Sequence, residues 1–370
     1  MPSSVIDRTV GFRLGSTAET KTAFTEPLGK GFYSYARREN PTVASCELAL
    51  AAIEKAEKCL LTTSGMAAIN VAFSIFNDPN DHRPWIFPDN AYSGTIDYAE
   101  NILKKQRGTN VILANSKIKN STTASLIEAI MKTAPALVFI EPVSNPLLDV
   151  IDVPEVINVA HQNGALVVVD NTFATPYLFR PLESGADIVV HSATKYLGGH
   201  NNILAGVIAV NDLDLYDRLI CHRNVIGSVL SPDDAGRLEN QLKTFSLRAA
   251  KQNETAMKIA KYLDTHPGVV EVRYPGLPSH AEHDLAHKLF GERGFGAIVT
   301  FDLAGSQKDS SQFVDSLSPY IPHIGSLGDV ETTFLQVEAC FLEGYSQSTI
   351  RLSIGIELAD EIIKRLDQVL

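Results

Sequence analysis

Cysteine is scarce in this chain of 370 residues, and the few cysteines present do not cluster. Cys46, Cys59, Cys221 and Cys340 lie far apart in the sequence. They form neither a CxxC metal-binding motif nor the paired spacing of a disulfide framework. Because disulfide-stabilised domains are typical of oxidising compartments, this pattern predicts a protein of a reducing, cytoplasmic environment.

Basic clusters and long apolar runs are also missing. Lys and Arg total 32 against 43 Asp and Glu, which gives a net charge of −11. Nucleic-acid binding normally requires a basic face, so this balance argues against a nucleic-acid partner. The N-terminal MPSSVIDRTVGFR has no apolar core of the kind a signal peptide needs, and no run of about eighteen apolar residues could span a membrane. We therefore expect neither nucleic acid nor a membrane among the partners.

What the chain does have is an alternation of apolar, strand-like segments with amphipathic, helix-like segments. Strands are expected at 85–89, 110–115, 136–142, 165–170, 188–190 and 205–211. Helices are expected at 43–58, 65–76, from about 122 and at 154–163. This alternation predicts an α/β fold, in which a mostly parallel sheet is covered by helices on both faces.

The length of the chain suits two domains better than one compact core. A long helix is expected over 238–262, and the pattern changes after it. Strands near 269–274, 297–303 and 350–356, with a terminal helix from about 358, predict a smaller α+β domain. We therefore expect an N-terminal arm over 1–41, a large domain over 42–239 and a small C-terminal domain over 240–370.

Lys195 stands at an unusual place in this pattern. It follows the apolar segment Ile188 to Val190, where a central strand of the predicted sheet ends, and ligands of open α/β sheets bind at that edge. Desolvation there favours the free amine that forms a Schiff base. Asp170 ends another apolar segment 25 residues earlier. A Schiff-base lysine with such an aspartate is the pair that pyridoxal phosphate requires, although a loop lysine and a capping carboxylate are the plain alternatives.

Six ordered motifs, which run nearly end to end, carry a resemblance to a known family. They are YSYARRENPT (33–42), SGMAA (64–68), EPVSNP (141–146), VDNTFATP (169–176), SATKY (192–196) and IRLSIGIE (350–357). With them the chain resembles the Cys/Met metabolism enzymes that depend on pyridoxal phosphate (PLP), such as cystathionine γ-synthase and γ-lyase. The resemblance implies fold type I, the aspartate aminotransferase-like fold, with PLP as the cofactor.

The resemblance also implies roles for residues of these motifs. Lys195 and Tyr92 would be catalytic, and Tyr92 would also stack on the cofactor ring. The other cofactor-binding residues would be Gly65, Met66, Asp170, Ser192 and Thr194, joined by Tyr35 and Arg37 of the neighbouring subunit. The substrate would contact Asn145, Ser326 and Arg351. Since Arg351 sits inside an apolar strand, an unpaired guanidinium there would be costly, and a substrate carboxylate would offset that cost. A homodimer would be the minimal active unit, and a homotetramer the full assembly.

The motifs are shared among several reactions, so the substrate has to be inferred from pocket residues. Relatives that take cystathionine tend to carry a glutamate or tyrosine where this chain has Gly325. We therefore predict a lyase or transferase that eliminates or replaces the γ-substituent of a sulfur-containing or O-acylated amino acid, such as methionine, homocysteine or O-acetylhomoserine. A cystathionine γ-lyase, γ-synthase or β-lyase is the alternative. Two departures from the family pattern, Asn202 and VEACFLEG (337–344), leave open a side branch with a specialised substrate.

Other readings of the sequence carry less weight. No GxGxxG motif opens a strand–helix unit, which disfavours a nicotinamide-dependent oxidoreductase. A catalytically inactive protein of this fold is a stronger rival, but Lys195 and Asp170 are both retained. His280, His283 and His287 would share a face of a helix, yet surface histidines explain them better than a metal site does. We predict no metal.

Overall fold

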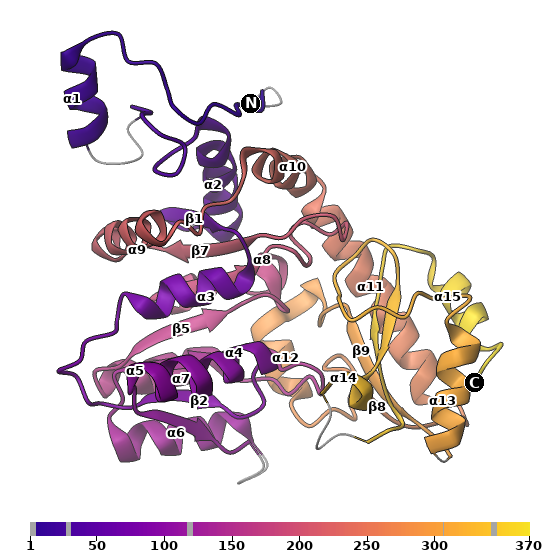
Figure 1. Ribbon diagram of the computed structural model, residues 1–370. Helices are drawn as coiled ribbons and strands as arrows, with labels where there is room; N and C mark the ends of the chain where they lie inside the picture. Colours follow the sequence, from indigo (N-terminus) through magenta and orange to yellow (C-terminus); the bar gives the residue numbers. More distant parts are fainter. Residues whose placement is uncertain (1–4, 27–30, 117–120, 306, 342–345) are drawn as a thin grey trace.

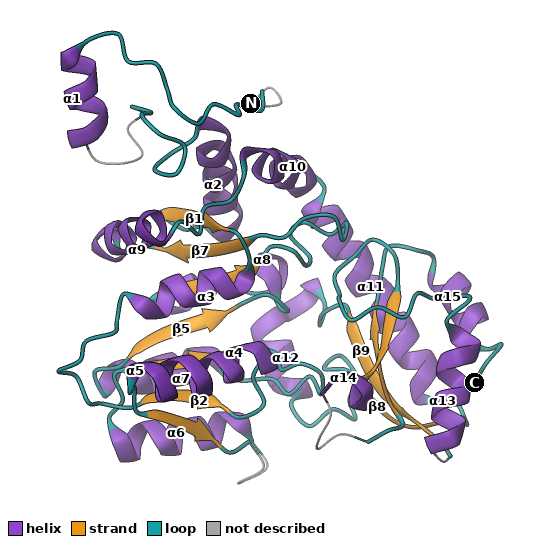
Figure 2. Cartoon of the chain, viewed as in Figure 1, coloured by secondary structure: helices purple, strands orange, loops and turns teal. Residues whose placement is uncertain are grey.

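The computed structural model describes residues 5–26, 31–116, 121–305, 307–341 and 346–370, and its largest element is a seven-stranded sheet (Figures 1 and 2). The strand order is β1-β7-β6-β5-β4-β2-β3. The strands are β1 (Lys58–Thr62), β2 (Trp85–Pro88), β3 (Val111–Ala114), β4 (Leu137–Ile140), β5 (Leu166–Asp170), β6 (Ile188–Ser192) and β7 (Gly206–Val210). β7 is antiparallel to both of its neighbours, and the other pairings are parallel. The expected mostly parallel sheet is confirmed.

Helices cover both faces of this sheet. One face packs against α3 (Gly65–Ser74), the π-helix η1 (Tyr98–Lys104) and α9 (Leu213–Ile226). The other packs against α2 (Pro41–Glu54), α6 (Thr122–Thr133) and α7 (Val153–Gln162). Because both faces are covered, strands such as β4 are buried at every position and read as uninterrupted apolar runs. Among the described residues, no helix combines the length and apolarity that crossing a membrane takes.

Short helical segments lie in the connections between strands of the large sheet, and one of them follows β2 and another follows β5. They are α4 (Ser93–Asp97), α5 (Lys105–Arg107), α8 (Thr175–Leu178) and η3 (Pro181–Ser184). α4 follows β2 and continues into η1 and α5, so the chain stays helical from Ser93 to Arg107. This helical segment therefore begins close to the carboxyl end of β2.

A four-stranded antiparallel sheet forms the centre of the C-terminal part, in the order β10-β11-β9-β8. Its strands are β8 (Val269–Arg273), β9 (Ile298–Leu303), β10 (Thr333–Gln336) and β11 (Thr349–Ser353). The helices of this part are α11 (Phe245–Asp264), α12 (His283–Phe290), η4 (Gly291–Arg293), α13 (Gln307–Leu317), α14 (Val337–Phe341) and α15 (Ala359–Leu366). The sheet has its own apolar core, with Phe301 and Leu352 fully buried against α11 and α15. The smaller α+β unit is thus present, while its predicted boundary after residue 239 stays a prediction.

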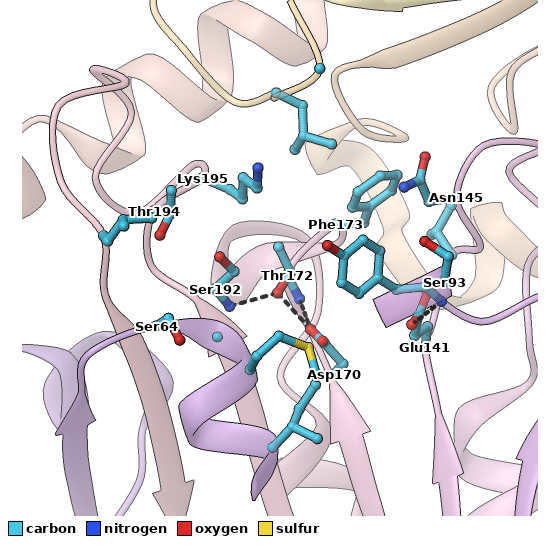
Figure 3. A pocket seen from close by; sticks show the side chains of 18 of the residues that line it. Ser64, Ser93, Glu141, Asn145, Asp170, Thr172, Phe173, Ser192, Thr194 and Lys195 are labelled. Carbon is cyan, nitrogen blue, oxygen red and sulfur yellow. Dashed lines mark hydrogen bonds between the residues drawn. The ribbon is translucent and has the colours of Figure 1, made fainter. Parts of the chain in front are cut away.

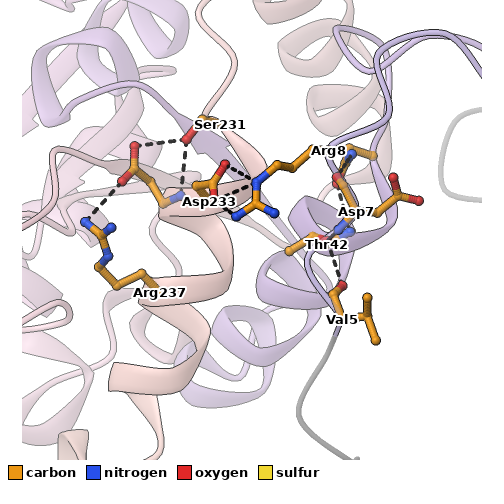
Figure 4. Close-up of polar contacts among 9 residues, drawn as sticks. Val5, Asp7, Arg8, Thr42, Ser231, Asp233 and Arg237 are labelled. Carbon is orange, nitrogen blue, oxygen red and sulfur yellow. Dashed lines mark hydrogen bonds and ion pairs between the residues drawn. The ribbon is translucent and has the colours of Figure 1, made fainter.

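The N-terminal arm is anchored at its base and extends away from the sheet. Arg8 pairs with Asp233 of α10 (Pro232–Leu242), and the Asp7 N–H donates to Thr42 Oγ1 at 2.9 Å (Figure 4). Beyond this base, α1 (Thr17–Thr25) lies apart from the large sheet (Figure 1). The sequence predicted an irregular arm and missed this helix. α1 buries a single residue, so it carries almost no apolar periodicity.

Two predicted helices differ from the structure. The helix expected over 43–58 ends at Glu54, because Lys55 takes a left-handed conformation with φ 54°, and β1 follows at once. The helix expected over 238–262 is two helices, α10 and α11, which break at Lys243 and Thr244. Neither break contains glycine or proline, so the sequence gives little sign of it.

Candidate functional site

A cavity of about 390 Å³ lies where the carboxyl ends of β4, β5 and β6 face the smaller sheet (Figure 3). Many of the residues predicted for the site line it. They are Gly65, Met66, Tyr92, Asn145, Asp170, Ser192, Thr194, Lys195 and Arg351. The order of the parallel strands brings the residues of the large sheet together, because the carboxyl ends of such strands meet at one edge, and Arg351 joins them from the smaller sheet.

Lys195 lines this cavity, and its amine contacts Ser326 of the C-terminal part of the chain. Its Nζ donates a hydrogen bond to Ser326 Oγ at 2.8 Å. Burial first, and the nearby positive charge of Arg351 second, lower the pKa of the lysine to about 8. A pKa near 8 makes a neutral amine available close to physiological pH, which is what a nucleophile or base needs.

Asp170 sits deep in the cavity at the end of β5. Its Oδ1 accepts hydrogen bonds from the Thr172 N–H at 3.0 Å and from Thr172 Oγ1 at 2.5 Å. Thr172 Oγ1 in turn accepts from the Ser192 N–H at 2.8 Å, so one hydroxyl joins β5 to β6 (Figure 3). Burial raises the pKa of Asp170, whereas the Thr172 donors and His191 act to lower it. The Asp170 carboxylate is therefore held in one orientation, in which it could pair with a bound cationic group.

The start of α3 forms a backbone cradle beside Ser192. Ser64 caps the helix by accepting from the Ala67 N–H, and Gly65 and Met66 are its first residues, whose N–H groups have no carbonyl one turn back. A Cβ at Gly65 would lie 2.8 Å from Ser192 Cβ, and one at Gly206 would lie 2.0 Å from the Ser64 carbonyl oxygen. Glycine at both positions thus lets three backbone segments meet at a helix N-terminus, an arrangement suited to an anion such as phosphate.

Tyr92 marks the opposite wall and is 43% exposed. It is the N-cap residue of α4, and its N–H donates to Glu141 Oε1 at 2.8 Å. Its ring lies over Gly94, where a Cβ would come within 2.6 Å of the ring. A side chain at position 94 would require the Tyr92 ring to move, so Gly94 and the ring position are coupled.

Arg351 is 3% exposed and reaches the cavity from β11. Its Nη1 donates to Asn145 Oδ1 at 3.0 Å, and its Nη2 donates to the Ser326 carbonyl at 3.1 Å. Asn145, Ser326 and Arg351, the three predicted substrate residues, are thus one hydrogen-bonded group. The group spans both sheets and holds the guanidinium in a fixed orientation, which suits recognition of a carboxylate.

Tyr35 and Arg37 are not brought to the cavity of their own chain. Tyr35 is 42% exposed, and Arg37 lies over its ring at 5.7 Å while donating to the Asn224 carbonyl. Arg37 lines a separate surface hollow together with Arg38, Asp217, Cys221 and Asn224. In a single chain, therefore, these two residues do not contribute to the cavity.

Sequence reasoning missed several residues of the site. Glu141 and Thr172 bear polar groups inside it, and both belong to motifs already recognised, EPVSNP and VDNTFATP. The sequence also did not predict the apolar residues that line the cavity. It consists of Ile69, Val143, Phe173, Leu204, Leu327 and Leu335. The signal for Glu141 was its position directly after β4, equivalent to that of Asp170 at the end of β5.

Asn202, one of the two departures from the family pattern, lies outside the cavity lining, as do the buried residues Arg223 and His191. Asn202 accepts from Gln241 Nε2 at 2.9 Å and does not line the cavity. Arg223 is buried and paired with Glu47 at 2.8 Å. His191 lies within 2.5 Å of Glu54 in the core beneath the sheet edge. Part of VEACFLEG, residues 342–344, lies outside the described residues.

The three histidines of the helix-like segment do not converge on one point. His283 bonds the Pro275 carbonyl at 2.9 Å and stacks on Phe295, while His280 lies beside Glu282. Within the described ranges, no group of three or more His, Cys, Asp or Glu side chains could hold a metal ion.

Comparison with known proteins gives one consistent result. The family model described as Cys/Met metabolism PLP-dependent enzyme matches residues 2–370. The chain is 35% identical to a cystathionine beta-lyase of Lactococcus lactis over 98% of this chain and 95% of the relative. It is 34% identical to a cystathionine gamma-lyase of Bacillus subtilis over 91% and 88%.

Among solved structures, a cystathionine gamma synthase of Xanthomonas oryzae in complex with aminoacrylate and cysteine matches with a TM-score of 0.87. That match has 33% identity and covers 100% of this chain and 94% of the other. The fold is therefore PLP-dependent fold type I, as expected. With the motifs, the cavity and these matches in agreement, the chain belongs to the Cys/Met metabolism family of PLP-dependent enzymes.

Proposed function

We propose that this enzyme uses PLP to eliminate or replace the γ-substituent of a short, sulfur-containing or O-acylated L-amino acid. The observation that carries this proposal is the position of Lys195. Its amine, with a pKa of about 8, faces a cavity that also holds Asp170 and Arg351. A base, a partner for a cationic ring and a partner for a carboxylate are the groups that PLP chemistry on an amino acid needs.

The residues present fit the cofactor. The cradle at Gly65, Met66 and Ser192 suits its phosphate, and Asp170 at the deep end suits its pyridine nitrogen. Tyr92 on the opposite wall has a ring that suits stacking. When bound, PLP supplies an electron sink that stabilises negative charge at the substrate α-carbon.

The chain's own residues would perform the remaining steps. Arg351, oriented by Asn145 and Ser326, would bind the substrate α-carboxylate. Lys195 would accept the α-proton, and for departure from the γ-carbon it would move a second proton at the β-carbon. Ser326 Oγ holds the amine at 2.8 Å and so restricts where it can reach. Tyr92 would pass a proton to the leaving group.

The distal part of the cavity supports a short substrate. A Cβ at Gly325 would meet no atom within 4 Å, and the apolar side chains of Leu327 and Leu335 line the same cavity. The distal end of cystathionine carries an ammonium and a carboxylate. Leaving such a group unpaired costs about 1–3 kcal/mol, or roughly a ten- to hundredfold loss in kcat/KM.

Cystathionine cleavage or synthesis is the second candidate, and the relatives support it. The matches described above are named as a cystathionine beta-lyase, gamma-lyase and gamma synthase. Those names describe the relatives. In this chain the choice depends on whether anything near Gly325 binds the distal charges of cystathionine.

A substrate panel separates the two candidates. We expect kcat/KM for methionine, homocysteine or O-acetylhomoserine to exceed that for cystathionine, with keto acid, ammonia and replacement product assayed with and without added thiols. The variant Gly325→Glu should shift the preference toward cystathionine by about tenfold, because its carboxylate can pair with the distal ammonium. The variant Gly325→Ala is the matched control and should leave the preference unchanged. If wild-type protein processes cystathionine best, the short-substrate proposal is wrong.

For partners and location we propose a homodimer, assembled further into a homotetramer, in the cytoplasm. The exposed positions of Tyr35 and Arg37 support the dimer, since they would complete the cavity of a second copy. The scattered cysteines support a reducing compartment: Cys46 and Cys59 are free and buried, and Cys221 is free and exposed.

A further inference from the structure

Two carboxyl groups, not one, stand at the deep end of the cavity. In the parallel ladder between β4 and β5, Ile140 pairs with Val169, so Glu141 and Asp170 are the next residues on neighbouring strands. Neighbouring strands lie about 4.8 Å apart, and residues at the same level of a parallel pair point to the same face. Both side chains line the cavity, and Glu141 is 7% exposed. Neither of these buried acids can ionise without affecting the other.

The surroundings of the two carboxyl groups differ. Asp170 receives two hydrogen bonds from Thr172 and lies in the field of His191, and all three favour its ionised form. Glu141 receives one hydrogen bond, from the Tyr92 N–H at 2.8 Å. Burial raises the pKa of Glu141 well above its usual range, and the charge of Asp170 raises it further.

The basic side chains around the pair are engaged with other groups. Lys195 bonds Ser326, and Arg351 bonds Asn145 and the Ser326 carbonyl. His191 is paired with Glu54 at 2.5 Å. Within the described part of the chain, the interactions that act most on Glu141 are burial, Asp170 and the Tyr92 N–H, and none of them is a cation.

We propose that Glu141 holds the single proton shared by this pair, so that Asp170 is its ionised member, and that the Glu141 carboxyl group positions the turn at Tyr92. Glu141 is then a positioning residue. This inference rests on the proposed function, because it assigns Asp170 alone to the pyridine nitrogen.

The physical consequence concerns charge and geometry together. A neutral Glu141 leaves one negative charge at the deep end, which matches one cationic ring nitrogen. Tyr92 makes no side-chain cap at the start of α4, and its own N–H is held by the Glu141 oxygen, which thus helps to position the backbone under its ring. The protonation state of Glu141 therefore determines the net charge at the deep end of the cavity, and its hydrogen bond to the Tyr92 N–H helps to position the Tyr92 ring.

Infrared spectroscopy tests where the proton resides, without depending on activity. Protein labelled with ¹³C-glutamate should show, at neutral pH, the carbonyl stretch of a buried, protonated carboxylic acid in both apo and PLP-bound forms. Glu141→Gln should remove that band, and Glu155→Gln, a change at an exposed glutamate, should not. If wild-type protein lacks the band, or if Glu141→Gln retains it, the proton assignment is wrong. Since the apo form is tested too, this result stands even if the proposed function fails.

The affinity for PLP tests the positioning role. Glutamine keeps an acceptor for the Tyr92 N–H and leucine does not, so Glu141→Leu should bind PLP about tenfold more weakly than Glu141→Gln. Fluorescence titration of the apo variants measures this ratio, and thermal unfolding checks that both are folded. Equal affinities in two folded variants would overturn the positioning role. If the leucine variant does not fold, circular dichroism of the folded glutamine variant against wild type decides, since the proposal requires an unchanged Tyr92 signal.

Discussion

The environment of Lys195 determines the pH at which its amine is available. Its pKa is lowered from 10.5 to about 8, first by burial and then by the positive charge of Arg351. Since the neutral form is the reactive one, reactivity should rise as the pH passes through about 8 and level off above it. Labelling of apo-protein with an amine-selective reagent, followed by peptide mass analysis, should show this midpoint at Lys195.

Replacing Arg351 by methionine isolates the contribution of charge. The variant keeps the burial of Lys195 but removes the repulsion between two cations, so the midpoint for Lys195 labelling should rise while staying below 10.5. A midpoint that falls or does not move would contradict the assignment of Arg351 as a cause. Lys258, which is exposed on α11, serves as an internal control in both proteins, because its hydrogen bond with Glu254 raises its pKa and Arg351 is not a cause of that shift.

At the scale of single residues, the position of a polar residue at the end of an apolar strand was the sequence feature that predicted which side chains lie at the sheet edge. Lys195 and Asp170 could be predicted because each follows an apolar strand. Thr172 could not, because its importance comes from one hydroxyl that donates to Asp170 and accepts from the Ser192 N–H, a contact between strands. Glu141 also directly follows a buried strand, but within EPVSNP the family resemblance implied a role only for Asn145.

At the scale of elements, two connections of the large sheet are tied together next to the cavity. Asp149 Oδ2 accepts from Asn90 Nδ2 at 2.8 Å and from Ser144 Oγ at 3.2 Å. Asn90 is two residues before Tyr92, and Ser144 is directly before Asn145. The carboxylate of Asp149 thus holds in register the turn that carries the ring and the loop that orients Arg351.

Removing the hydrogen bonds that Asp149 accepts from Asn90 and Ser144 should impair catalysis more than folding. In Asp149→Ala the two connections lose their common acceptor, and misplacement of Tyr92 and Asn145 should lower kcat/KM by roughly ten- to a hundredfold. Asp149→Asn keeps an acceptor oxygen and is the matched control, expected to lose much less. Steady-state kinetics with the preferred substrate measure both variants. Equal activity of the alanine variant and wild type would show that the connections are held by other contacts.

The elements that sequence patterns failed to predict are those that depend on neighbours. β1 follows an alanine-rich helix without a turn signal, and its pairing with β7 over Lys58 to Thr62 is what makes it a strand. β10 is similarly defined by its ladder with β11. The central strands were predictable because both of their faces are buried, which leaves an apolar run that local sequence shows directly.

At the scale of the whole molecule, the arm carries two residues, Tyr35 and Arg37, that we propose to serve another copy of the chain. Its base pairs with the body through Arg8 and Asp233 (Figure 4). Tyr35 and Arg37 are not among the residues that line the cavity of their own chain. Large apolar side chains are exposed on α2, α9 and α11, among them Leu48, Val225 and Leu247. Exposed apolar groups of this size commonly mark interfaces between proteins.

Mixing two inactive variants tests this arrangement. Lys195→Ala removes the base, and Arg37→Ala removes the proposed phosphate ligand, so each alone should have little activity. If Arg37 serves the partner's cavity, a hybrid dimer contains one site with both changes and one site with neither. Random exchange of equal amounts makes half of the dimers hybrids, and the mixture should regain about a quarter of wild-type activity. If Arg37 instead served its own chain, every hybrid site would carry one change and no activity would return; a wild-type monomer that stays active at high dilution would contradict the shared site as well.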